Sequence, residues 1–206
     1  MTGTAHPAHP AHPGPSQRPA GRPRSQEVDA AILAAALDLL IERGAVLTSI
    51  EQVAQRAGVT RATVYRRFPD KTALLIQAIE SVHQAPESEV LDWPDIDRML
   101  TDWATYLSMP RNRSMLRRLY GAVDDYPELL QTYRSSHSAR RASAELATLT
   151  RARDNGQLPP DRDLNILQQV LAGAILHHLG AYPDSTSAAD VKTYLTAVLQ
   201  QAGYHP

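Results

Sequence analysis

Gly58 separates two short stretches of helical periodicity, and the turn it implies constrains the fold more than any other feature of the sequence. In residues 49–56 the apolar positions share one helical face, and in residues 61–68 Val64 and Phe68 lie four positions apart. A turn of about three residues between helices needs a positive φ, which glycine adopts without strain. The sequence therefore predicts two short helices joined by a tight turn, the helix-turn-helix arrangement.

Capping residues indicate where these helices begin. Thr48 and Glu51 have the spacing of a capping box, with Thr48 as the N-cap of the first helix. Thr60 is placed to cap the second helix. Asp70, directly after Pro69, is placed to cap a further helix that extends to about residue 83.

A longer helix is expected before the motif, at residues 25–43, and Gly44 supplies a natural left-handed stop. Residues 1–24 are rich in proline and are expected to form a disordered tail. In polyproline II geometry three histidines of the tail would share one edge, so it either binds a metal or is a solvated extension without function. Its arginines either reach into a minor groove or form a basic linker. These residues are His6, His9 and His12, and Arg18, Arg22 and Arg24.

The composition narrows the class of protein. Of the 206 residues, 43% are apolar and only 5% are aromatic, so the chain can bury a core made mainly of aliphatic side chains. The lack of cysteine excludes disulfides and thiolate sites and fits a reducing compartment. No apolar run suits a bilayer and no secretory signal is recognisable, so we expect a cytoplasmic protein with no membrane partner. The net charge of -1 does not by itself indicate a nucleic-acid partner.

Residues 57–74, which include the second helix of the predicted helix-turn-helix, match the pattern AGVxxxTxYxxFxxKxxL at every fixed position. The pattern falls on Ala57, Gly58, Val59, Thr63, Tyr65, Phe68, Lys71 and Leu74. With it, residues 30–79 resemble the TetR family of bacterial transcriptional regulators. The resemblance implies an all-α fold of about nine helices, with an N-terminal three-helix helix-turn-helix DNA-binding domain and a C-terminal helical ligand-binding and dimerisation domain. It also implies that the third helix enters the major groove and that a small-molecule ligand relieves repression.

Three segments are expected along the chain. Residues 1–24 form the tail, residues 25–83 form the DNA-binding domain with a linking fourth helix, and residues 84–206 form the ligand-binding and dimerisation domain. Prolines and acidic residues that follow residue 83 indicate the joint.

Side-chain chemistry assigns roles on DNA within this frame. Arginine can donate two hydrogen bonds to guanine, so Arg61 is the first candidate for base reading, and Arg66 either reads a base or holds a phosphate. Ala62 and Thr63 can meet a thymine methyl or a base edge. The expected phosphate contacts are Thr48 or Ser49, Thr60, Tyr65, Arg67 and Lys71. For Tyr65 the alternative is packing between helices, and for Lys71 it is a solvated side chain.

Five more helices are expected in the second half, at about residues 95–108, 111–123, 127–154, 161–181 and 187–202. The last two carry apolar stripes and are expected to form a homodimer interface, two helices from each subunit. A two-fold dimer would read a palindromic site on double-stranded DNA. The alternative is that both stripes belong to the core of one chain. The stripes are Leu164, Leu167, Val170, Leu171, Ala174, Ile175 and Leu179, and Val191, Leu195, Val198 and Leu199.

A ligand pocket is expected among these helices. The residues able to line it are Trp103, Tyr106, Leu116, Tyr120, Tyr133, His137 and His177, although ordinary packing or exposure is the alternative for each. No metal-ligand spacing, activated nucleophile, phosphate loop or dinucleotide motif is recognisable, so no metal site, cofactor or catalysis is expected. The favoured hypothesis is a DNA-binding repressor released by a small molecule. The alternative is an architectural or partner-binding DNA-binding protein without such an effector.

Overall fold

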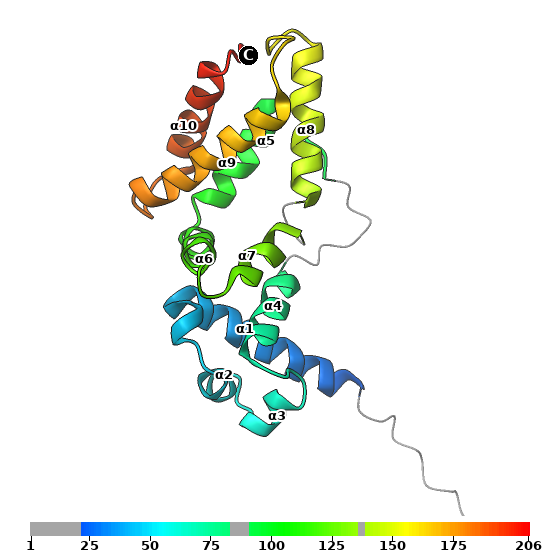
Figure 1. Cartoon of the computed structure of the whole chain (residues 1–206), viewed down its shortest axis with the longest axis vertical. Coiled ribbons are helices and arrows are strands. Elements are labelled where there is room, and N and C mark those ends of the chain that lie inside the picture. Colours follow the sequence, from blue (N-terminus) through cyan, green and yellow to red (C-terminus); the bar gives the residue numbers. More distant parts are fainter. Residues whose placement is uncertain (1–21, 83–90, 136–138) are drawn as a thin grey trace, which may run out of the picture.

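The structure of the chain is a computed structural model that describes residues 22–82, 91–135 and 139–206 (Figure 1). These residues form ten helices and no strand, so the predicted all-α class is confirmed. None of the helices in these three ranges combines the length and apolar character needed to cross a membrane. The helices are α1 (Arg22–Leu47), α2 (Ile50–Arg56), α3 (Arg61–Tyr65), α4 (Lys71–Val82), α5 (Ile96–Leu107), α6 (Pro110–Gly121), α7 (Pro127–Tyr133), α8 (Ala139–Asp154), α9 (Leu164–Ala181) and α10 (Ala188–Gln201).

The helices fall into two groups with α6 and α7 between them (Figure 1). At one end α1 packs against α2 and α4, and at the other α5, α8, α9 and α10 pack against one another. Contacts of α6 with α1, and of α7 with α4, join the groups. All ten helices contribute buried apolar side chains to one core, in which Trp93 and Trp103 meet edge to face with ring centroids 6.2 Å apart.

Helix α1 differs from the expected helix at both ends. It begins at Arg22, so residues 22–24 are helical and do not belong to the predicted tail. The rest of that tail, with its three histidines, lies outside the described residues. At the other end Gly44 has a φ of 82° and interrupts the helical geometry, as a left-handed glycine is expected to do, and the chain then continues to Leu47.

The capping box of α2 lies one residue later than predicted. The Ser49 hydroxyl accepts a bond of 3.2 Å from the Gln52 backbone N–H, and the Gln52 side chain accepts one of 3.1 Å from the Ser49 N–H. Thr48 is buried, and its hydroxyl donates to the Gly44 carbonyl at 2.8 Å. The predicted pairing of Thr48 with Glu51 was wrong because either hydroxyl residue has a suitable acceptor three positions later, so the spacing alone does not choose between them.

Helix α3 is shorter than the expected helix at residues 61–68. Thr60 caps it as predicted, accepting a bond of 3.2 Å from the Thr63 N–H. Regular helix ends at Tyr65, and Arg66 to Phe68 form a further turn in which the Phe68 N–H donates to the Val64 carbonyl. The turn keeps Phe68 in the core although it lies beyond the helix.

The single helix expected at residues 127–154 is two helices. Helix α7 ends at Tyr133 and α8 begins at Ala139, which brings the count among the described residues to ten instead of about nine. The intervening sequence is polar and offers no apolar position that a continuous helix could bury.

Candidate DNA interface and ligand pocket

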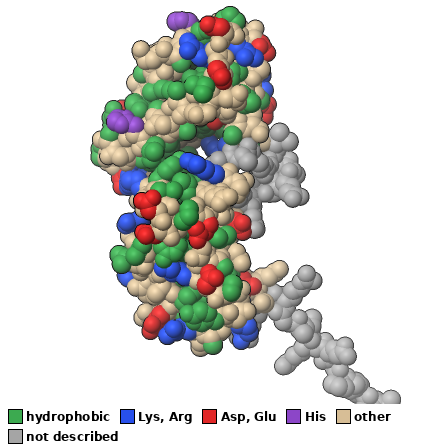
Figure 2. Space-filling view, viewed as in Figure 1, with side chains coloured by type: hydrophobic (Ala, Val, Ile, Leu, Met, Phe, Trp, Pro, Cys, Tyr) green, Lys and Arg blue, Asp and Glu red, His purple; other side chains and the backbone are tan. Residues whose placement is uncertain are grey.

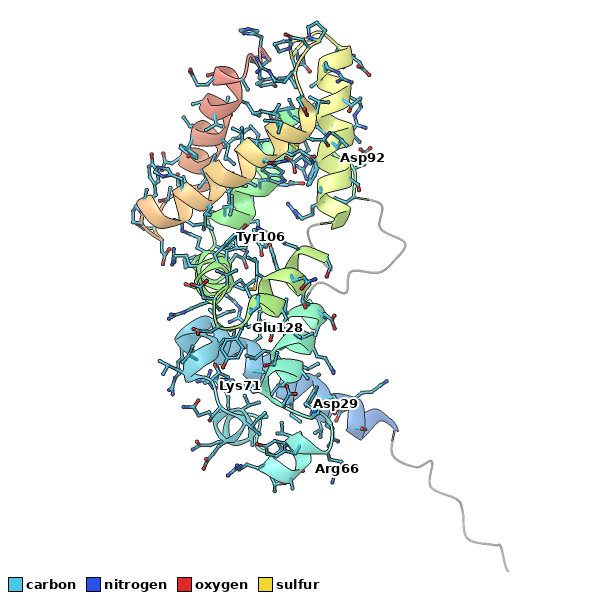
Figure 3. All side chains as sticks on the ribbon, viewed as in Figure 1. Asp29, Arg66, Lys71, Asp92, Tyr106 and Glu128 are labelled. Atoms are coloured by element: carbon cyan, nitrogen blue, oxygen red, sulfur yellow. The ribbon has the colours of Figure 1, made fainter. Side chains whose placement is uncertain are left out.

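Helix α3 has one face in the core and one in solvent. Val64 and Phe68 are 0% and 3% exposed, which fixes the inner face. In Figure 3, Arg66 lies at the end of the molecule remote from α8, α9 and α10. The exposed residues of the outer face are Arg61, Ala62, Tyr65 and Arg66.

The ends of α2 and α3 add polar groups to this surface. Ser49 and Thr60 are exposed, and the Thr60 hydroxyl lies 3.0 Å from that of half-buried Thr63. The Arg61 side chain is 60% exposed, with its guanidinium 3.9 Å from the Glu51 carboxylate. Basic and acidic side chains are interspersed at this end of the molecule in Figure 2. The outer face of α3 is therefore a small basic surface within a region of mixed charge.

Three residues expected to hold phosphates have partners inside the protein. Thr48 is buried and bonded to Gly44, so the predicted phosphate contact of its side chain is corrected to a structural role. Arg67 is ion-paired with Asp29 and donates to a carbonyl of α3. The Lys71 ammonium donates to the Ala45 carbonyl at 2.9 Å and lies over a tyrosine ring of the α6–α7 turn. Phosphate contacts of Arg67 and Lys71 remain predictions that require these side chains to change partner.

An ion pair attaches α2 to α1. The Arg56 guanidinium donates two bonds to the Glu42 carboxylate, at 2.7 and 2.8 Å. These bonds lower the pKa of Glu42, so the pair stays charged near neutral pH. The two helices behind α3 are thus held together on their exposed side as well as in the core.

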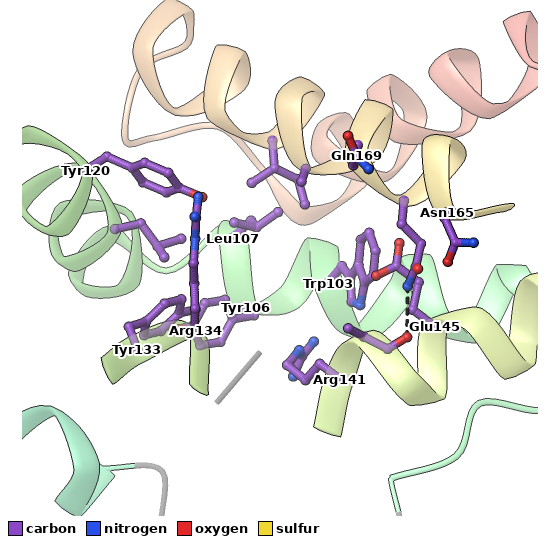
Figure 4. A pocket seen from close by; sticks show the side chains of 15 residues that line it. Trp103, Tyr106, Leu107, Tyr120, Tyr133, Arg134, Arg141, Glu145, Asn165 and Gln169 are labelled. Atoms are coloured by element: carbon purple, nitrogen blue, oxygen red, sulfur yellow. Dashed lines mark hydrogen bonds between the residues drawn. The ribbon is translucent and has the colours of Figure 1, made fainter. Parts of the chain in front are cut away.

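A cavity of about 640 Å³ lies among α5, α6, α7, α8 and α9 (Figure 4). Its size suits a small organic molecule. Five of the seven predicted lining residues border it, namely Trp103, Tyr106, Leu116, Tyr120 and Tyr133. His177 does not, because it is exposed on α9, and His137 lies outside the described residues. No group of three or more acidic, histidine or cysteine side chains in the described ranges is arranged to hold a metal ion.

The polar part of the cavity wall was missed by the sequence analysis. It consists of Arg134, Arg141, Glu145, Asn165, Gln168 and Gln169. Most of these residues lie on α8 and α9, whose polar positions resemble those of any solvated helix face. The spacing of Arg141 and Glu145, four apart on one helical face, was the available signal.

Glu145 has the most unusual environment in the cavity. Its side chain is buried, with the residue 9% exposed, and its Oε1 atom has no hydrogen-bond partner among the described residues. Burial raises the pKa of Glu145 to about 7, and the Gln168 amide and the Arg141 charge only partly oppose that shift. A carboxyl group with these properties is poised to respond to whatever enters the cavity.

Comparison with known proteins finds a family model that matches each of the two parts of the chain. Residues 32–78, which contain α2 and α3, match the sequence model described as bacterial regulatory proteins, tetR family. Residues 93–198, which surround the cavity, match the model described as tetracyclin repressor-like, C-terminal domain. The chain belongs to the tetR family. It is a DNA-binding transcriptional regulator.

Individual tetR-family proteins resemble the chain over most of their length. It is 27% identical over 165 residues to the HTH-type transcriptional regulator YdeS of Bacillus subtilis, which covers 77% of this chain and 81% of YdeS. It is 29% identical over 168 residues to the DNA-binding transcriptional repressor TetR of Mycobacteroides abscessus, and the match covers 76% of this chain and 84% of that protein. The crystal structure of a TetR-family regulator from Rhodococcus sp. shares the fold with a TM-score of 0.66, at 19% identity, over 86% of this chain and 98% of that one.

In this tetR-family chain, α9 buries in its own core most of the apolar face that was expected at the dimer interface. Most of the predicted stripe residues are core: Leu164, Leu167, Leu171, Leu179, Val191, Leu195 and Leu199 are each at most 5% exposed. Large apolar side chains instead project outward from a second face of α9. These are Ile166, Val170 and Leu176, which are 54%, 47% and 43% exposed, with exposed Gly173 between them.

The first prediction concerns base reading by Arg61. Replacing Arg61 with Ala should cost about 1–3 kcal/mol of operator affinity and relax the preference at one base pair, because a bidentate contact to guanine is lost. Fluorescence anisotropy titrations against a selected operator and its single-base variants measure both effects. Arg162→Ala, an exposed arginine at the opposite end of the molecule, is the control with the same charge change. Equal weakening on every sequence would instead assign Arg61 to a phosphate.

The second prediction concerns the pH dependence of stability. The pKa of Glu145 is about 7 in the folded protein and near 4.5 when exposed, so the folded state binds this proton more tightly. The stability that Glu145 gains from binding this proton more tightly in the folded state is therefore full below about pH 4.5 and is lost as the pH rises through about 7. Across this window wild-type stability should fall relative to Glu145→Gln by up to about 3 kcal/mol. Urea denaturation at several pH values measures the free energy of unfolding of each protein. The control variant Glu128→Gln should show the same pH dependence as the wild type. Parallel plots of unfolding free energy against pH for the wild type and Glu145→Gln would contradict the assignment.

Proposed function

We propose that this regulator is a homodimeric repressor that binds a palindromic operator through α3 and is released when a small organic molecule fills the cavity. The observation that carries the proposal is the cavity itself, of about 640 Å³ and lined by aromatic and polar side chains. An architectural DNA-binding protein with no effector would be expected to have a solid core in this half. The cavity favours the ligand-responsive reading over that alternative.

Helix α6 supports a link between the cavity and the DNA-reading end. Leu116 and Tyr120 of α6 line the cavity. On another face of the same helix, the Arg118 guanidinium donates to the Ile41 and Glu42 carbonyls of α1, at 3.3 and 2.9 Å. A ligand that displaces α6 would therefore displace α1 and the motif packed on it.

Helix α7 supplies a second link. Tyr133 lines the cavity at the end of α7, and Tyr126 at its start lies under the Lys71 ammonium, 4.9 Å from ring centroid to nitrogen. Lys71 begins α4, the helix that follows the DNA-binding motif. We propose that α6 and α7 together transmit ligand binding to the motif.

The proposed DNA contacts follow from the side-chain chemistry of α3 and its neighbouring turns. Arg61, Ala62 and Thr63 read bases, while Arg66 reads a base or holds a phosphate. Ser49, Thr60 and Tyr65 hold phosphates, and Arg67 and Lys71 join them after changing partner. We retain the proposed division into a DNA-binding domain at residues 25–83 and a ligand-binding and dimerisation domain at residues 84–206, with the N-terminal boundary moved by the helical residues 22–24.

The proposed dimer interface is the outward face of α9 with the adjoining α10. Ile166, Val170 and Leu176 would bury their exposed apolar surface against a second subunit, and Gly173 would allow close approach of the two helices. Two-fold symmetry would then place two α3 helices on successive turns of the DNA.

The third prediction tests repression. Genome-wide binding in the native host should find a few palindromic sites, one of them beside the regulator's own gene, and transcription from those sites should rise when the gene is deleted. A repressor with sequence preference produces this pattern because specific sites outcompete non-specific ones by several orders of magnitude. Hundreds of sites without a shared sequence would overturn the proposal in favour of an architectural protein.

The fourth prediction tests the dimer interface. Val170→Glu should raise the dimer dissociation constant by at least about a hundredfold, because an unpaired carboxylate would be buried in the apolar contact. Light scattering on eluting protein at several concentrations measures the change in mass. Gln131→Glu, which adds the same charge at an exposed position of α7, should remain dimeric. A dimeric Val170→Glu variant would place the interface elsewhere.

A further inference from the structure

Two buried polar atoms in the cavity wall have no partner in the described part of the chain. They are the Glu145 Oε1 atom and the Trp103 Nε1 atom, in residues that are 9% and 7% exposed. Both residues border the cavity (Figure 4). A buried polar group without a hydrogen bond destabilises a fold, so such atoms in a cavity wall indicate an occupant that supplies the missing partners.

The nearest candidate partner for Glu145 on α8 is Arg141, one helical turn earlier, but Arg141 does not donate a hydrogen bond to the Glu145 Oε1 atom. The Arg141 guanidinium instead lies over the rings of Trp93 and Tyr106, with its central carbon 5.3 and 5.9 Å from their centroids. Arg134 likewise lies 5.9 Å over the Tyr120 ring. The arginines of the wall therefore lie against aromatic faces, and none of those whose side chains are described forms an ion pair with the Glu145 carboxyl group.

The rest of the wall indicates the shape and charge of the occupant. Trp103, Tyr106, Tyr120 and Tyr133 surround the cavity with aromatic surface, which favours a flat apolar body and attracts organic cations. A protonated amine is the group that best satisfies an unpaired carboxylate oxygen, because its N–H bond to the oxygen is charge-assisted. An acceptor on the same molecule would take the free indole N–H of Trp103.

We infer that the cavity selects a protonated organic amine with a flat apolar body, and that its ammonium group donates to Glu145 Oε1. The inference names the ligand class of the effector cavity and so rests on the proposed function of that cavity. Glu145 is the specificity-determining residue, and Trp103 orients the bound molecule.

The inference fixes a direction of pH dependence. An ammonium group binds the ionised carboxylate, so affinity is full above the Glu145 pKa of about 7 and falls as the pH drops below it. The other titratable or charged groups of the wall are Tyr106, Tyr120, Tyr133, Arg134 and Arg141. Burial raises the pKa of Tyr106 and of Tyr133, so these phenols stay neutral in this range. Affinity should be about tenfold lower at about pH 6 than at about pH 8.

The test uses three probes of one shape and different charge, with the full-length protein. Isothermal titration calorimetry compares naphthylmethylamine, naphthylmethanol and naphthoate at about pH 6, 7 and 8. The amine should bind at least about tenfold more tightly than the alcohol or the acid at the highest pH, because only the amine pairs with the carboxylate. Tighter binding of naphthoate, or no measurable binding of the amine, would overturn the inference.

Two variants locate the effect. Glu145→Gln should lose both the preference for the amine and the pH dependence, whereas Glu128→Gln, the same substitution outside the cavity, should keep both. Circular dichroism checks that the variants are folded. An amine preference that survives in Glu145→Gln counts against the inference.

Operator release is measured separately, by adding each probe to the protein–DNA complex. If the amine binds through Glu145 without releasing DNA, the ligand class stands and ligand-controlled repression fails. If naphthoate binds and releases DNA, repression stands and the ligand class fails.

Discussion

The buried guanidinium of Arg113 holds the centre of the molecule together. Arg113 lies on α6, is 0% exposed, and donates to the Asp184 carboxylate at 3.0 Å and to the Tyr182 carbonyl at 2.8 Å. Further bonds reach the Leu107 carbonyl and both the carbonyl and the ring of His178. Burial and the Arg113 charge lower the pKa of His178, so its neutral ring can accept the bond. Because every donor direction is satisfied, this charge can be buried, and it fixes α6 to the ends of α5 and α9.

With one face of α6 fixed in this way, its remaining faces contact both α1 and the cavity. Arg118 reaches the carbonyl end of α1, and Arg111 reaches Asp38 of the same helix at 2.6 Å. Leu116 and Tyr120 face the cavity. A displacement of α6 by a ligand must therefore either break bonds of Arg113 or move α9 and α1 together. Such a network favours a few discrete arrangements over continuous deformation, which is the property a two-state regulator needs.

The sequence predicted the motif well because its signals are local. Gly58, the Thr60 cap and the buried Val64–Phe68 pair each depend only on residues within one or two turns. The errors have a different origin. Periodicity shows that α9 has apolar residues, but it does not show whether a stripe faces its own chain or a second subunit, and α9 has one apolar face in the core and other apolar side chains in solvent. The environment of Glu145 could not be predicted from local sequence either. The aromatic rings over which Arg141 lies belong to Trp93 and Tyr106, which precede Arg141 by 48 and 35 residues.

Arg113 and Glu145 show how the same physics can serve structure and function. Both are buried charge-bearing side chains, and removing either from water is costly. Arg113 has partners at the end of α5 and at and just after the end of α9, so its burial adds rigidity. Glu145 has a raised pKa and a free oxygen in a cavity wall, although an arginine lies one turn away on the same helix. The chain satisfies every donor of Arg113 but leaves an oxygen of Glu145 without a partner in the cavity wall. The free-energy cost of burying Glu145 therefore lies where a bound ligand can remove it. In the proposed function, that free energy would shift the equilibrium between the DNA-bound and released states.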